Sequence, residues 1–109
     1  MKLHHAPFEM IKNGEKTIEL RLYDEKRRGI SVGDEIEFTR SDENERMYCR
    51  VVALHVFSDF AELYSELPLL KCGYTNEDVS TATADDMNAY YSAEEQSKYG
   101  VVGIELTLI

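Results

Sequence analysis

The 109-residue sequence contains no tryptophan, only two prolines, two cysteines and three histidines. Two cysteines cannot build the disulfide framework of a small secreted domain, and Cys49 and Cys72 do not have the spacing of a metal motif. With so few histidines and cysteines we expect no metal site and no cofactor. The thiols are therefore expected to be reduced, as in a cytoplasmic protein.

Long apolar runs are also missing. No stretch approaches the roughly 20 residues that span a bilayer, and the start, MKLHHAPFEM, lacks the apolar core of a signal peptide. We expect a cytoplasmic protein without a membrane partner. A composition of 43% hydrophobic and 30% charged residues fits one globular domain over residues 1–109.

Basic residues are scarce but unevenly placed. The chain has 12 Lys/Arg against 21 Asp/Glu, a net charge of −9. Residues 1–30 hold seven basic and five acidic residues, whereas residues 31–109 hold five and sixteen. An acidic surface of this kind does not favour binding to duplex DNA, which needs many phosphate contacts. It favours a local site for a small anion or a short single strand.

The hydrophobic pattern predicts an α+β domain. We expect a short strand within residues 2–6, then a short helix that starts at Pro7 and stops at Asn13-Gly14. Alternating strands follow at 17–23 and 35–40, a polar hairpin connection at 41–46, and a long, bent central strand at 47–57.

The last half of the chain predicts a helical insert and a closing strand. Ser58 is a candidate cap for a helix ending near Pro68, and shorter helices are expected to start at Thr75, Thr83 and Ser92. Residues 100–109 alternate again. The whole order predicts a small, mostly antiparallel β-barrel, with a helix after the first strand and a helical insert before the last.

The strand at 17–23 carries the most informative pattern. Its apolar residues alternate and are expected to enter the core, so Thr17, Glu19, Arg21 and Tyr23 share the opposite face. Lys16 precedes the strand, and its direction stays open. A carboxylate between two cations should stay ionised. The set suits a nucleotide, with phosphate on Arg21 and Lys16 and the base on Tyr23. The alternative is a solvated face with a surface ion pair of at most about 1 kcal/mol.

The stretch GEKTIELR resembles the Gly-x-Lys-x-x-Glu-x-Arg signature of the ASCH domain (activating signal cointegrator homology) family, at Gly14, Lys16, Glu19 and Arg21. The sequence around this stretch has the same order as small stand-alone prokaryotic members of the family. It has MIKNG before the stretch, VGDEIEF after it and KYGVVGIEL as the closing strand. The resemblance implies a PUA-like β-barrel with a cleft for single-stranded RNA or a nucleotide-like ligand. We expect Lys16, Glu19, Arg21, Tyr23 and His5 to bind that ligand.

The resemblance leaves the enzyme question open. A metal-independent ribonuclease would use Lys16 and Glu19 as catalytic residues, with His5 as an optional acid. The 4-acetylcytidine amidohydrolases of this family look like Lys-Thr-Ile-Thr-x-Arg at this place. In this chain Glu19 occupies the position of their second threonine, which supplies the nucleophilic hydroxyl. A carboxylate cannot replace that hydroxyl in the same mechanism. A non-catalytic protein-interaction or regulatory module is the third alternative.

Three tyrosines frame the last predicted helix. We expect Tyr90, Tyr91 and Tyr99 to pack this helix against the barrel rather than to stack on a nucleobase.

Overall fold

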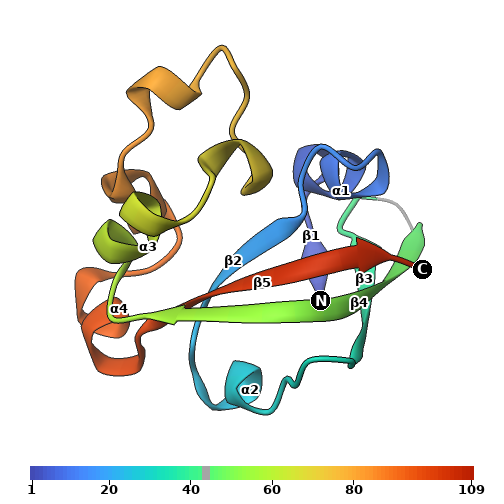
Figure 1. Ribbon diagram of the computed structural model, residues 1–109, viewed down its shortest axis with the longest axis horizontal. Coiled ribbons are helices and arrows are strands. Elements are labelled where there is room, and N and C mark those ends of the chain that lie inside the picture. The colour runs from blue at the N-terminus through green and yellow to red at the C-terminus, as the bar shows by residue number, and fades with distance from the viewer. Residues whose placement is uncertain (43–44) are drawn as a thin grey trace.

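A curled sheet of five strands organises the chain, and the computed structural model describes residues 1–42 and 45–109 (Figure 1). Within the predicted 41–46 connection, Glu43 and Asn44 lie outside the described residues. The strand order is β1-β3-β4-β5-β2, and all neighbours are antiparallel except β1 and β3. The strands are β1 (Lys2–Leu3), β2 (Ile18–Leu22), β3 (Glu35–Arg40), β4 (Arg46–Phe57) and β5 (Val101–Leu108).

This α+β half-barrel is consistent with a PUA-like barrel and confirms the predicted fold. Its helices are α1 (His5–Lys12), α2 (Glu25–Arg28), α3 (Phe60–Glu66) and α4 (Ala93–Tyr99), with 3₁₀ turns at Leu69–Lys71, Val79–Thr81 and Ala84–Ala89. The helix after the first strand and the helical insert before the last are both present. In the described part of the chain, no helix is long and apolar enough to cross a membrane.

Helix α1 starts two residues earlier than expected, at His5, so Pro7 occupies its third position. The first turn tolerates this, because its N–H groups have no partner inside the helix in any case. The predicted stop is correct, since Gly14 has φ +86°. The Asp24 carboxylate caps helix α2 by accepting from the Arg27 N–H.

The caps in the second half of the chain are partly as predicted. Asp59, not Ser58, caps α3, because its carboxylate accepts from the Glu62 N–H at 2.9 Å. Both residue types are good caps, and sequence alone does not separate neighbours. Ser92 caps α4 with the expected capping box, and Thr83 starts a 3₁₀ helix. Thr75 opens a turn instead of a helix.

Two apolar clusters meet along β5. The first fills the space under α1, β3 and β4, and includes Phe8, Phe38 and Cys49. The second lies between β2 and the helical insert, which is the segment 58–100 that joins β4 to β5 and includes α3. Strand β4 bends at a register shift between Val51 and Ala53, as expected of the central strand. The insert, yellow to orange in Figure 1, therefore lies against β2 on a core of its own.

Candidate functional site

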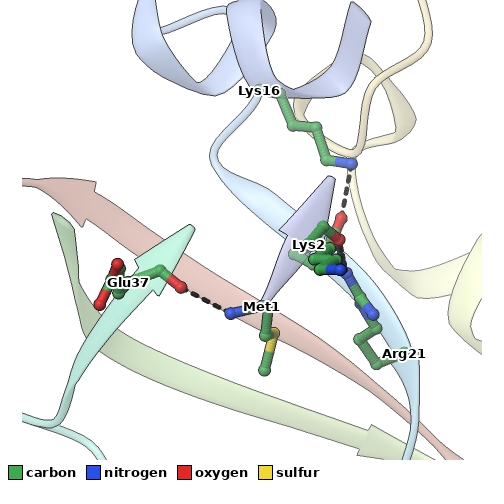
Figure 2. A network of polar contacts seen from close by, with 6 residues as sticks. Met1, Lys2, Lys16, Arg21 and Glu37 are labelled. Carbon is green, nitrogen blue, oxygen red and sulfur yellow. Dashed lines mark hydrogen bonds and ion pairs between the residues drawn. The ribbon is translucent and has the colours of Figure 1, made fainter. Parts of the chain in front are cut away.

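Three charged side chains form a buried chain of ion pairs on β2 and just before it. Lys16 Nζ donates to Glu19 Oε1 at 2.7 Å, and Arg21 donates to Glu19 Oε2 through Nε at 2.9 Å and Nη2 at 2.7 Å. Figure 2 shows Lys16 and Arg21 on either side of the site, with Arg21 close to Lys2. The side chains of Lys16, Glu19 and Arg21 are only 8%, 6% and 16% exposed. The solvated-face alternative is therefore wrong.

Local structure explains this arrangement. Glu19 and Arg21 are two residues apart on β2 and share a face, while β5 holds the strand opposite Ile104 and Val102. The Lys16 N–H donates to the Met10 carbonyl at 3.0 Å, just after the end of α1. This bond positions the Lys16 backbone, and the side chain, whose direction the sequence left open, points toward Glu19.

The two cations keep Glu19 ionised. Burial alone raises the pKa of this carboxyl, but the charges and hydrogen bonds of Lys16 and Arg21 outweigh burial and hold its pKa below the ordinary value. Two cations and one carboxylate carry a net charge of +1. The site thus keeps an excess positive charge in a place with little water.

Arg21 also connects the two ends of the sheet. Its Nη2 donates to the carbonyl of Lys2 at 3.1 Å, from β2 to β1. These are the two outermost strands of the sheet order. One guanidinium therefore orients Glu19 and spans the open side of the half-barrel.

The ion pairs line a cavity of about 520 Å³ between α1, β2 and the insert. Lys2, Lys16, Glu19 and Arg21 form its charged side. A volume of this size matches the lower half of the range of small-ligand sites.

The insert supplies the opposite wall, which the sequence did not predict. Its residues include Gly73, Tyr74, Asp78, Asp86 and Tyr90. The Tyr74 hydroxyl donates to Asp86 at 2.7 Å and lies 2.7 Å from the Tyr64 hydroxyl. Burial raises the pKa of the Tyr74 hydroxyl, and its hydrogen bonds with Tyr64 and Asp86 raise that pKa further. This network connects helix α3 to the 3₁₀ turns that follow it in the insert, beside the cavity.

Gly73 of the insert lies beside the Lys16 side chain. It has φ +112°, and a Cβ at this position would lie 3.4 Å from Lys16 Cδ and 3.7 Å from Nζ. The positive φ favours glycine here, while a Cβ would make ordinary van der Waals contact with the lysine.

Two of the five predicted ligand residues lie away from this cavity. His5 is exposed and its Nδ1 lies 3.6 Å from the Asp42 carboxylate, while its neighbour His4 lines the cavity. Tyr23 packs against the first apolar cluster, with the Arg28 guanidinium 4.4 Å from its ring centre. The structure brings together Lys16, Glu19 and Arg21 only.

The three tyrosines near α4 divide into two groups. Tyr91 stacks on Phe60, with ring centres 6.1 Å apart, and Tyr99 packs on the same apolar cluster. The packing prediction is confirmed for these two. It is wrong for Tyr90, which is 68% exposed and lines the cavity. An exposed tyrosine at a cavity is a candidate surface for base stacking.

The arrangement is better suited to binding than to acid–base or nucleophilic chemistry. Both Glu19 oxygens already accept from cations, and its pKa is lowered, so it is a weak base. Among the described residues that line the cavity there is no serine or threonine. Cys72 lines it, but burial raises the pKa of that thiol to about 11.

Comparisons with known proteins agree with this fold. The chain is similar to the hypothetical protein PH0355, whose crystal structure matches with 33% identity, a TM-score of 0.79 and complete coverage of both chains. It is also similar to protein PF0455 from Pyrococcus furiosus, whose solution NMR structure matches with 30% identity and a TM-score of 0.71, over 100% of this chain and 98% of that one. No curated protein matched the sequence. The model of the ASCH domain matches residues 1–109, and the chain belongs to the ASCH domain family.

Proposed function

We propose that the cavity beside Lys16, Glu19 and Arg21 binds single-stranded RNA or a nucleotide-like ligand. ASCH domains are proposed to bind RNA. The observation that carries the proposal for this chain is the buried chain of ion pairs, with two cations and one carboxylate beside a cavity of about 520 Å³. The net charge of +1 on these three side chains favours an anionic group on the ligand, while the cavity lining as a whole holds three cations and three carboxylates.

The remaining hydrogen-bond donors of the site support this proposal. Arg21 uses Nε and Nη2 for Glu19 and Lys2, and among the described residues its Nη1 has no hydrogen-bond partner. Lys2 is exposed at the cavity. A phosphate oxygen can accept from both side chains. The exposed ring of Tyr90 is available to stack on a further base of a single strand.

The charge distribution supports a short single-stranded ligand. The chain carries a net charge of −9. A duplex would place many phosphates against acidic surface, whereas the few phosphates of one or two nucleotides can be met by Lys2 and Arg21 at the cavity. The chemistry at Glu19 favours binding over cleavage, because a carboxylate held by two cations does not readily take a proton.

The test is a binding titration with a fluorescently labelled single-stranded RNA at increasing salt, followed by anisotropy. We expect wild type to bind and to weaken with salt, by about one counterion for each phosphate contact. Arg21→Ala should weaken binding at least about tenfold, since it removes a charge-assisted contact. Arg46→Ala, which removes a surface arginine paired with Glu37, is the matched control.

Circular dichroism of each variant separates lost binding from lost folding. The same samples on a denaturing gel test for cleavage. If the folded wild type binds neither RNA nor nucleotides at low salt, the proposal is wrong. Binding to a protein partner, insensitive to salt, would then identify the interaction module considered as an alternative.

A further inference from the structure

We propose that a nucleotide enters this cavity base first, with the base against Lys16 and the phosphate at the opening near Lys2 and Arg21. This inference rests on the proposed function and defines its orientation. It reverses the arrangement that the sequence suggested, in which Lys16 and Arg21 hold the phosphate and a tyrosine holds the base. Three features of the cavity carry it.

The first feature is the gradient of exposure along the charged side. The side chains of Glu19 and Lys16 are 6% and 8% exposed, that of Arg21 is 16% exposed, and Lys2 lies open to solvent. A phosphate is strongly hydrated, and taking it to the most buried part costs more than leaving it at the opening. A base is uncharged and nearly flat. The deep position therefore favours the base.

The second feature is the balance of charge around the cavity. Lys2, Lys16 and Arg21 face three carboxylates in the lining, Glu19, Asp78 and Asp86. A phosphate at the floor would lie close to Glu19, whereas a phosphate at the opening meets Lys2 and Arg21. The apolar side chains of Leu20, Cys72 and Met87 also line the cavity. They suit the faces of a nucleobase.

The third feature is the spare hydrogen-bonding capacity of Lys16. An ammonium group has three donors, and Lys16 uses one for Glu19 at 2.7 Å. Within the described residues the other two have no protein acceptor, although the side chain is 8% exposed. A carbonyl oxygen of a base satisfies this need. Uracil, cytosine and guanine carry such an oxygen and adenine does not, so we expect adenine to bind most weakly.

The experiment competes small molecules against a labelled oligouridine bound to wild type. We expect uridine, which has a base and no phosphate, to compete with little dependence on salt. Ribose 5-phosphate, which has no base, should compete at least about tenfold more weakly, because it lacks the contact to a buried charge. Adenosine should also compete more weakly than uridine.

The outcomes separate this inference from the proposed function. If oligouridine binds but ribose 5-phosphate competes as well as uridine, the orientation is wrong and the proposed function stands. If oligouridine, uridine and uridine 5′-monophosphate all fail to bind, the proposed function fails and the inference with it. These comparisons use only the wild-type protein, so they do not depend on how a variant folds.

Two variants test the assignment of each end. Lys16→Met should weaken uridine and uridine 5′-monophosphate by similar factors, at least about tenfold. Lys2→Met should weaken the monophosphate several-fold more than uridine, because the two ligands differ only in phosphate. A folded Lys16→Met protein that binds uridine as tightly as wild type would overturn the inference.

Discussion

The guanidinium of Arg21 lies 3.1 Å from the carbonyl oxygen of Lys2, across the open side of the half-barrel. The same guanidinium makes two hydrogen bonds to Glu19. Stability and the proposed ligand binding therefore depend on one side chain. A lysine cannot reproduce this geometry, since its ammonium lacks the planar fork of arginine.

Arg21→Lys should reduce both properties while it preserves the charge. We expect a loss of about 1–2 kcal/mol in the free energy of unfolding, because hydrogen bonds to Glu19 and Lys2 are lost. Urea unfolding measures this loss. Arg46→Lys, at a surface pair with 61% and 42% exposed side chains, should change stability by less than about 0.5 kcal/mol. Equal effects of the two substitutions would contradict a special role for Arg21.

Glu19→Gln should be strongly destabilising. It removes the carboxylate that lies between Lys16 and Arg21 and leaves two buried cations facing a neutral amide. Breaking a buried ion pair in this way costs about 3–5 kcal/mol. The control is Glu15→Gln, at an exposed residue between α1 and β2. Urea unfolding of both variants at neutral pH tests the expectation, which fails if their free energies of unfolding agree.

Acid should act on stability through Glu19. Its pKa in the folded protein lies below the ordinary value of 4.5, so the unfolded chain takes up the proton first as the pH falls. The stabilisation is complete above about pH 4.5 and is lost as the pH falls from there through the folded pKa. Urea unfolding from pH 7 to pH 3 should show this loss in wild type and a shallower one in Glu19→Gln. Parallel curves would contradict the assignment.

Gly73→Ala should separate backbone strain from site disruption. Gly73 and Gly33 both have positive φ, +112° and +96°, but only a Cβ at position 73 contacts another side chain, that of Lys16. Both alanine variants should lose about 1 kcal/mol or more of stability. Only Gly73→Ala should also weaken RNA binding in the anisotropy titration. Equal binding by the two folded variants would show that the contact with Lys16 is unimportant for the ligand.

Both thiols should be unreactive in the folded protein. Cys49 and Cys72 are 0% and 5% exposed, and burial raises the pKa of each. At pH 8 we expect a thiol reagent such as Ellman's reagent to label neither until urea is added. Ser97→Cys, on the exposed surface of α4, provides a reactive control. Labelling of a native cysteine at the rate of this control would contradict the burial.

The sequence predicted the strand that carries the site because alternation is a local property. Ile18, Leu20 and Leu22 face a core, and Glu19 and Arg21 therefore share the other face. Alternation does not say what covers that second face. Its cover comes from α1 and from the insert more than 50 residues later, so the burial of Lys16 and Glu19 was not predicted.

The wall of the cavity escaped prediction for a related reason. Asp86 and Tyr90 lie in short turns with no strong periodicity, where a residue's direction depends on tertiary contacts. Tyr90 and Tyr91 are adjacent in sequence, yet one is exposed at the cavity and the other stacks on Phe60. One signal was present: Gly73 has no side chain to pack, and a glycine beside a site marks a close approach.

The division of the cavity between sheet and insert also bears on how such a protein evolves. Arg21 lies on β2 and Lys16 lies just before it, so a substitution of either residue disturbs the barrel itself. The opposite wall is formed by turns of the insert, which contributes no strand to the sheet. If the cavity binds the proposed ligand, substitutions in the insert can alter its specificity without altering the framework that holds the charge. Related domains with the same strand motif are free to diverge in specificity while their sheets stay alike.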